Sequence, residues 1–338
     1  MQYIPYLERC GHSVQEFPLF DDAYLAQLYG GGTRSALARI RHYAKRIRQL
    51  RALRGVDLIW LEYELLPFIP RFLEELLSPS GLPYVVDYDD AIFHRYDAAG
   101  SRVVRAALGK KIDSVMAGAS AVVCGNAYLA ERARSAGAQQ VDVIPTVVDV
   151  SRYTAKNDHR SVESQYFTIG WIGSPSTQHY VLAVKRALQQ LNRNHRVPLR
   201  LIGASPEFAA SFPNVPVEVV EWSESSEAES IRQCDIGIMP LPDEPWARGK
   251  CGYKLIQYMA AGVPVVASPV GVNRKILKDW DCGLLADSSD AWIEAIRKLI
   301  DNEALRSRFG CNGRRAVEQC FSVQAQAPAL CNLLERCG

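Results

Sequence analysis

The sequence predicts an α/β protein with two domains, each a parallel sheet covered by helices. From Asp57 onward, strand-like apolar runs such as "DLIWLEY" and "PYVVDY" alternate with helix-like segments such as "SRVVRAALGKKIDSVMAG", and such alternation is typical of parallel sheets. The alternation stops at a polar stretch and restarts at "YFTIGWIG", and 338 residues are enough for two cores. The expected architecture is therefore two doubly wound, Rossmann-like domains that face each other across a crevice.

The polar stretch sets the domain boundaries. Residues 151–165, "SRYTAKNDHRSVESQ", show no apolar period and read as a connection between domains. We therefore assign an N-terminal domain, a linker, a C-terminal domain and a final helix, at residues 1–152, 153–165, 166–320 and 321–338 respectively. Packing of the final helix back on the N-terminal domain is one option.

The start of the sequence departs from this pattern. A doubly wound domain normally opens with a strand, whereas residues 2–10 look helical and "SVQEF", residues 13–17, is the first candidate strand. We expect that an opening strand and its loop are missing from this sequence. Because that strand is usually central in its sheet, we expect the 338-residue form to be less stable and weak or inactive in catalysis.

Composition excludes several classes of protein. The net charge of +2 is not that of a nucleic-acid-binding protein. No stretch approaches the apolar length of a membrane span, and the first residues lack the pattern of a secretory signal. Nine scattered cysteines without a CxxC pair indicate neither a disulfide framework nor a zinc site. A reducing cytoplasm is the expected compartment.

One basic segment offers a route to the inner face of a membrane. Residues 34–55 contain eight Arg or Lys and no acidic residue, and Leu37, Ile40, Ala44 and Ile47 fall on one face at helical spacing. A solvated surface helix and a helix that docks on anionic lipid headgroups explain this pattern about equally well. Nucleic acid is not an expected partner, because aromatic residues are not interleaved along the segment.

The segment "GKCGYKLIQYMAAGVPVVASPVGVN", residues 249–273, predicts a helix, a tight turn and a strand. The signals are the helical apolar stripe, a helix-ending glycine and a proline that blocks continuation, at Leu255, Ile256, Met259, Ala260, Gly262 and Pro264. Lys250 and Lys254 stand near the start of that helix, where free N–H groups and the helix dipole favour an anion. A phosphate group is the expected ligand.

Acidic and small residues follow other predicted strands. Asp87, Asp89 and Asp90 of "DYDD" come after "PYVVDY" and therefore lie at the carboxyl end of a strand, where open α/β sheets bind ligands. They read either as a functional carboxylate cluster, suited even to a divalent ion, or as turn and capping acids. The loops "IGWIGSPSTQ" and "MPLPDEPWARGK" reach the same rim. "RGKC" is not a P-loop, because Glu244 stands where the first glycine is required, and G-x-G-x-x-G is absent.

Taken together, "PYVVDYDDAIF", "IGWIGSPST" and residues 235–273 resemble the retaining glycosyltransferases of family 4, which have the GT-B fold. The variant "GKCGYKLIQYMAAG" is similar to that of a subset of bacterial surface-polysaccharide enzymes. The resemblance implies that the C-terminal domain binds a nucleoside-diphosphate sugar and that the N-terminal domain holds a carbohydrate or lipid-linked acceptor. It implies transfer to an acceptor hydroxyl with retention of anomeric configuration.

These considerations assign site residues. The expected catalytic residues are Asp87, Asp89, Asp90 and Glu244. The expected donor-binding residues are Gly173, Ser174, Asp243, Trp246, Arg248, Lys250, Gly252, Tyr253, Lys254 and Gln257. No cofactor and no metal are expected, because fixed lysines and helix N–H groups can stabilise the diphosphate charge.

The sequence also departs from the family pattern. The two glutamates of the Glu-x7-Glu motif fall on Gly249 and Gln257, and "GSPSTQ" is uncharged where the family has an Arg and Lys pair nearby. These departures leave two alternatives open, namely a non-catalytic sugar-nucleotide-binding protein of the same fold and a sugar-nucleotide epimerase.

Overall fold

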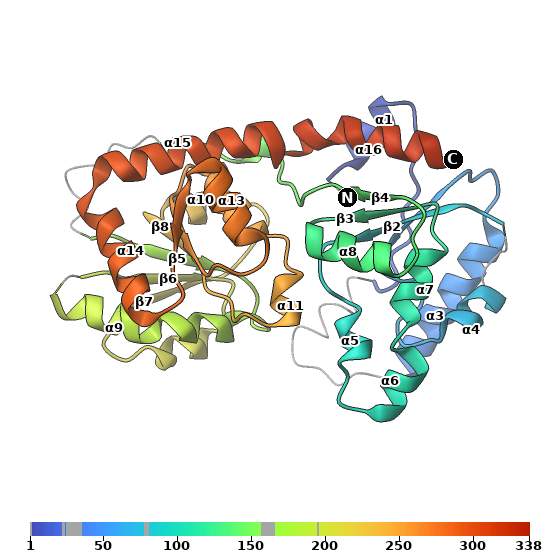
Figure 1. The fold of residues 1–338 in the computed structure, drawn as a ribbon, viewed down its shortest axis with the longest axis horizontal. Helices are drawn as coiled ribbons and strands as arrows, with labels where there is room; N and C mark the ends of the chain where they lie inside the picture. The colour runs from blue at the N-terminus through green and yellow to red at the C-terminus, as the bar shows by residue number, and fades with distance from the viewer. Residues whose placement is uncertain (1, 22–23, 25–35, 78–80, 157–165, 195) are drawn as a thin grey trace.

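The computed structural model describes residues 2–21, 24, 36–77, 81–156, 166–194 and 196–338. Figure 1 shows two α/β bodies, with a long pair of C-terminal helices running along both of them. Each body contains one parallel sheet, so the predicted fold class is confirmed. Among the helices that the structure describes, none combines the length and the apolar character needed to cross a lipid bilayer.

The N-terminal domain holds a four-stranded parallel sheet in the order β1-β2-β3-β4. The strands are β1 (Ile59–Glu62), β2 (Tyr84–Tyr88), β3 (Ala121–Cys124) and β4 (Val141–Val143). The helices before and between them are α1 (Ile4–Arg9), α3 (Ala36–Ala52), α4 (Arg71–Leu77), α5 (His94–Asp97), α6 (Arg102–Leu108), α7 (Lys111–Ala117) and α8 (Ala127–Ser135). Each strand pairs with the next in sequence, so β1 lies at one edge of this sheet.

The two faces of the N-terminal sheet are covered by different parts of the chain. Val86 and Val122 belong to a core with residues of α7 and α8, whereas Val85, Ala121 and Val123 pack against Leu7 of α1 and against α16 (Val323–Cys337). This alternation follows from the strand geometry, in which successive side chains point to opposite faces. The C-terminal helix is thus part of the core of the N-terminal domain (Figure 1).

The C-terminal domain holds a six-stranded parallel sheet in the order β10-β9-β8-β5-β6-β7. The strands are β5 (Ile169–Ile172), β6 (Leu199–Ile202), β7 (Val217–Val220), β8 (Ile236–Met239), β9 (Val265–Ala267) and β10 (Gly283–Leu285). Its α-helices are α9 (Lys185–Asn194), α10 (Glu227–Arg232), α11 (Pro245–Arg248), α12 (Tyr253–Ala260), α13 (Val272–Trp280), α14 (Ser289–Asp301) and α15 (Glu303–Cys320). The strand order reverses between β5 and β8, which is the switch point where doubly wound sheets bind ligands.

Several local expectations are corrected. Residues 13–17 are described and form no strand. The segment expected as one helix at 101–118 is divided into α6 and α7 at Gly109 and Lys110. The expected linker lies mostly outside the described residues. The strand expected to precede the chain stays a prediction.

The basic helix α3 is also rotated from its expected orientation. Of the four residues placed on one apolar face, only Ile47 packs on the domain core, together with Tyr43 and Leu50. Leu37 and Ile40 are 71% and 63% exposed. The reason is tertiary: the face that carries Tyr43 is the one that meets the domain, and the Tyr43 hydroxyl donates to the Pro67 carbonyl over 2.7 Å.

A buried ionic cluster supports the loop that follows β1. Lys111 Nζ lies 2.7 Å from Glu64 Oε2 and 2.9 Å from Glu74 Oε1, and it donates to the Leu66 carbonyl over 2.6 Å. All three charged side chains are buried. Burial raises the pKa of Glu74, and the Lys111 ammonium opposes that rise. Lys111 is thus the buried cation that both carboxylates share, while Arg71 and Arg95 approach Glu74 and Glu64 from the outside at 3.7 and 4.0 Å.

Candidate functional site

The loop after β5 approaches the crevice through a glycine. A Cβ atom at Gly173 would collide with the Trp171 ring and would lie 3.0 Å from Lys254 Cε. Only glycine therefore lets this backbone lie so close to the start of α12. Ser174, the next residue, shares a hydrogen bond of 2.8 Å with the Ser176 hydroxyl.

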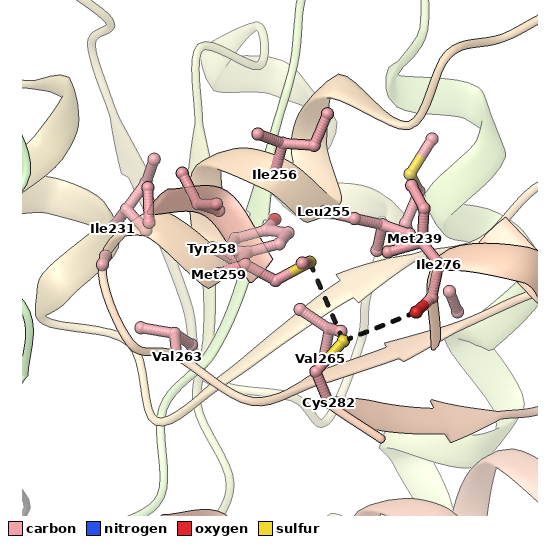
Figure 2. Packing of buried hydrophobic residues seen from close by; sticks show 14 of the residues in the cluster. Ile231, Met239, Leu255, Ile256, Tyr258, Met259, Val263, Val265, Ile276 and Cys282 are labelled. Carbon is pink, nitrogen blue, oxygen red and sulfur yellow. Dashed lines mark hydrogen bonds between the residues drawn. The ribbon is translucent and has the colours of Figure 1, made fainter. Parts of the chain in front are cut away.

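Helix α12 is anchored by a buried apolar face and begins at the rim of the crevice. Leu255, Ile256 and Met259 are fully buried in one hydrophobic cluster, as the helical stripe predicts. Figure 2 shows Met259 beside the Cys282 thiol, with 3.9 Å between the two sulfur atoms. Gly252 precedes the helix with a φ of 75° and gives no side-chain cap. The first backbone N–H groups of α12 therefore stay available to a ligand. Gly262 has a φ of 70°, which confirms the predicted helix end.

Two lysines stand at this helix start. Lys250 Nζ lies 3.3 Å from Asp90 Oδ1, so the ion pair crosses from one domain to the other. Lys254 Nζ lies 4.9 Å from the centroid of the Trp171 ring, and among the described residues it makes no ion pair. Burial, and then the nearby charge of Lys250, lower the pKa of Lys254 to about 8. A half-buried cation without a carboxylate partner is suited to a bound anion.

The three aspartates of "DYDD" occupy different positions. Asp87 stands on β2, in register with Glu62 of β1, and burial followed by the Glu62 charge raises the pKa of Asp87 to about 7. Asp89 accepts a hydrogen bond from the Tyr63 hydroxyl. Asp90 faces Lys250. The crevice therefore brings Asp89 and Asp90 towards the lysines, whereas Asp87 lies within the sheet.

Replacing Asp87 by asparagine is expected to stabilise the protein by about 1–3 kcal/mol at pH 8 and to change little at pH 4. The pKa of Asp87 in the folded state lies above the ordinary aspartate value of 3.8, so the folded state binds this proton more tightly than the unfolded state does. The stability that the bound proton contributes is therefore lost as pH rises from about 4 through about 7. Urea unfolding at both pH values measures this. Asp57→Asn, at an exposed position, is the control. A pH-independent difference would contradict the expectation.

The charged loop before α11 makes contacts of its own. Arg248 Nε donates to Asp243 Oδ1 over 2.7 Å, and both side chains are largely exposed. Glu244 accepts a hydrogen bond from Tyr180, whose pKa is raised by burial and then by Glu244. Trp246 packs against the core of the N-terminal domain. This loop therefore contributes Glu244 to the crevice, whereas Asp243 and Arg248 pair with each other.

The remaining predicted donor residues lie on α12. Tyr253 is 37% exposed on the first turn. Gln257, one turn further, is buried and hydrogen-bonded to Tyr153. Gln257 is therefore not placed to touch a ligand directly in this arrangement.

The structure adds residues that sequence reasoning missed. Tyr180 lies close enough to Glu244 and Asp90 for both charges to raise its pKa. Glu227 is buried between the Tyr153 hydroxyl at 2.6 Å and the Trp222 indole at 2.7 Å. Neither has a local sequence signal. Asn126 has a sequence signal, because asparagine is a common N-cap residue and it stands directly before a helix-like segment.

The placement of acidic, histidine and cysteine side chains bears on metal binding. Within the described part of the chain, no group of three or more His, Cys, Asp and Glu side chains is placed to hold a metal ion. His94, a lone histidine, instead contacts Asp97 Oδ1 and the Tyr128 hydroxyl, each at 2.8 Å. Independence from metal stays a prediction.

Comparison with known proteins agrees with this arrangement. Residues 166–302 match the model of the family described as Glycosyl transferases group 1. The phosphatidyl-myo-inositol mannosyltransferase of Mycobacterium leprae is 39% identical over 70 residues, which are 20% of this chain and 19% of that protein. This chain therefore matches about a fifth of that relative's length.

Solved structures match over nearly the whole chain. Sucrose-phosphate synthase from Thermosynechococcus elongatus has a TM-score of 0.71 at 17% identity, over 90% of this chain and 80% of that one. WaaG, a glycosyltransferase involved in lipopolysaccharide biosynthesis, has a TM-score of 0.67 at 14% identity, over 98% and 94%. HepE from Anabaena, solved with UDP-glucose, has a TM-score of 0.66 at 17% identity, over 93% and 88%. The chain thus has the GT-B fold, and its residues 166–302 are similar to group 1 glycosyl transferases.

Proposed function

We propose that this protein transfers a sugar from a nucleoside-diphosphate sugar to a hydroxyl acceptor, with retention of anomeric configuration. The observation that carries the proposal is the position of Lys250, Lys254 and the uncapped start of α12 at the sheet's switch point. Two cations and a helix N-terminus match the charge of a diphosphate. The match of residues 166–302 to group 1 glycosyl transferases supports the same donor class.

On the donor side, the lysines stabilise the charge that develops as the diphosphate leaves. When a diphosphate oxygen replaces Asp90 as the partner of Lys250, Asp90 becomes free to orient the acceptor hydroxyl. Glu244, held by Tyr180 at the same rim, is placed to contact the donor sugar. HepE, a structural neighbour, was solved with UDP-glucose, which makes UDP-sugars the first donors to test.

On the acceptor side, Asp89 and Asp90 face the crevice from the N-terminal domain. Burial, followed by the charge of Asp90, raises the pKa of Asp89 to about 6, so this carboxyl can exchange a proton near neutral pH. The mannosyltransferase relative is named for phosphatidyl-myo-inositol, and WaaG for lipopolysaccharide biosynthesis. We therefore place the acceptor among glycolipids or lipid-linked polysaccharides.

The test is a panel of UDP-, GDP-, ADP- and dTDP-sugars, assayed by thermal shift and by product analysis. A donor that binds only the folded state must raise the melting temperature. Transfer to a hydroxyl acceptor, with the product anomer assigned by NMR coupling constants, supports the proposal. Binding without turnover supports a sugar-nucleotide-binding protein instead, and a changed sugar without acceptor supports an epimerase.

The exposed side of α3 supports peripheral membrane contact as a second element of this function. Leu37 and Ile40 are 71% and 63% exposed, although both are large and apolar. Arg39, Arg41 and Lys45 are exposed on the same helix. Exposed apolar side chains among cations fit the boundary between lipid headgroups and acyl chains.

Binding to anionic vesicles is expected to fall as salt rises, with each basic group near the surface contributing about 1 kcal/mol. Ile40→Asp should weaken this binding, because it places a negative charge among the apolar contacts. Leu285→Asp, at an exposed apolar residue of the other domain, is the matched control. Cosedimentation with vesicles of phosphatidylcholine, with and without phosphatidylglycerol, measures the effect. Equal binding to neutral and anionic vesicles would contradict it.

A further inference from the structure

Asn126 connects the two domains through its side-chain amide. Its Oδ1 accepts from the Leu129 backbone N–H over 3.0 Å and so caps α8. Its Nδ2 donates to the Gly249 carbonyl over 2.8 Å and to the Lys250 carbonyl over 3.3 Å, in the loop before α12. The residue is 5% exposed. The amide oxygen thus hydrogen-bonds within the N-terminal domain, and the amide nitrogen hydrogen-bonds to the C-terminal domain.

The loop that Asn126 holds is closely enclosed by the N-terminal domain. There is no room for a Cβ atom at Gly249, because Ala91 lies against it, and none at Gly125, because the Cys251 thiol lies against it. Cys251 is 6% exposed and belongs to the hydrophobic core of the N-terminal domain, although its chain segment belongs to the C-terminal domain. The burial of Cys251 therefore depends on the two domains being in contact.

We propose that Asn126 is a positioning residue that latches residues 249–251 to the N-terminal domain and so fixes Lys250 opposite Asp90. The inference rests on the proposed function for its catalytic consequence, but the latch itself concerns only the contact between domains. The amide is required because the partners of its nitrogen are all acceptors, namely the two carbonyl oxygens and the Cys251 Sγ at 3.3 Å. A carboxylate at this position would still cap α8 but would repel both carbonyls.

The test uses the Cys251 thiol as a reporter of domain contact. The hydrogen bond from Asn126 lowers the pKa of this thiol, so its loss alone would slow alkylation, and a faster reaction reports exposure of the thiol. In Asn126→Asp, alkylation of Cys251 by N-ethylmaleimide, followed by peptide mass spectrometry, is expected to accelerate about tenfold or more, the factor that corresponds to losing hydrogen bonds of ordinary strength. Cys234 and Cys282 are fully buried inside the C-terminal domain and should stay protected. They report whether the domain itself has unfolded.

Asn302→Asp is the matched control. Asn302 caps α15 by accepting from the Leu305 N–H over 2.8 Å, as Asn126 caps α8. Asn302 and Leu305 belong to the same domain, so this cap does not link the two domains. This variant should leave the alkylation of Cys251 unchanged. If Asn126→Asp exposes Cys234 and Cys282 as well, Asn126→Ser decides the question, because serine keeps a capping oxygen and lacks the amide. If the ratio of Cys251 to Cys234 alkylation is unchanged in Asn126→Asp, or in Asn126→Ser where the first variant unfolds, the proposed role of Asn126 as a latch is wrong.

A catalytic readout separates positioning from simple loss of structure. The kcat for transfer should fall about tenfold in Asn126→Asp, because Asp90 is no longer held opposite the donor site. The Kd for UDP should change less than threefold, because Lys250, Lys254 and α12 all belong to the C-terminal domain and can still meet the diphosphate. Equal losses in kcat and in affinity would overturn the positioning role. If the wild-type protein turns over no donor, the alkylation ratio still decides the latch, so failure of the proposed function is distinguishable from failure of this inference.

Discussion

Replacing Lys111 by methionine is expected to destabilise the protein by about 3–5 kcal/mol, the cost of leaving buried charges without their partner. Lys111 is 3% exposed and is the cation shared by Glu64 and Glu74. Methionine preserves most of the volume, so the loss reports charge compensation rather than a cavity. Urea unfolding at pH 7 measures the change.

The neighbouring lysine supplies the control for this prediction. Lys110 is exposed, so Lys110→Met should change stability by less than about 0.5 kcal/mol. The penalty in Lys111→Met should shrink as pH falls, because Glu74, whose pKa burial already raises, then takes up a proton and loses its charge. A loss of less than 1 kcal/mol, or one that does not depend on pH, would show that the cluster does not need the cation.

Lys250→Ala and Lys254→Ala are each expected to weaken binding of a nucleoside-diphosphate sugar by about 1.5–3 kcal/mol, which is roughly 10- to 150-fold. The reason is the loss of one charge-assisted hydrogen bond to a phosphate oxygen. Isothermal titration calorimetry with the preferred donor measures it. Lys275→Ala is the control, since Lys275 is an exposed lysine of the same domain that pairs with Asp279.

The pH dependence of binding distinguishes the two lysines. Lys254 loses its charge above its pKa of about 8, so donor affinity should fall as pH rises from about 7.5 to 9. This fall should be much smaller in Lys254→Ala and should persist in Lys250→Ala. Unchanged affinity in both alanine variants would mean that the diphosphate binds elsewhere.

Features coded by local signals could be predicted from the sequence. The helix, turn and strand around Gly262 follow from the apolar spacing, the glycine itself and the following proline, and all three elements are present. The orientation of α3 could not be predicted, because both of its faces carry apolar residues and the rest of the domain selects between them.

In the candidate site, too, the features with a local sequence signal could be predicted, and those set by tertiary packing could not. The sequence predicts that Lys250 and Asp90 each lie at the crevice, because Lys250 precedes a helix that begins there and Asp90 follows a strand that ends there. Their ion pair is not predicted, because 160 residues separate them and only the docking of the domains brings them together. Gln257 was expected at the donor because of its motif position, but the structure turns it towards Tyr153. Tertiary packing, which no local pattern encodes, decides such orientations.

The position of α16 has a consequence for synthesis on the ribosome. Val85, Ala121 and Val123 are covered by a helix that is translated only after the entire C-terminal domain. During elongation, one apolar face of the first sheet therefore stays open while the second domain is made and can already fold. The nascent chain must keep that face from associating with other chains until its own helix arrives. Assembly of the N-terminal domain is thus completed last, although its strands are made first.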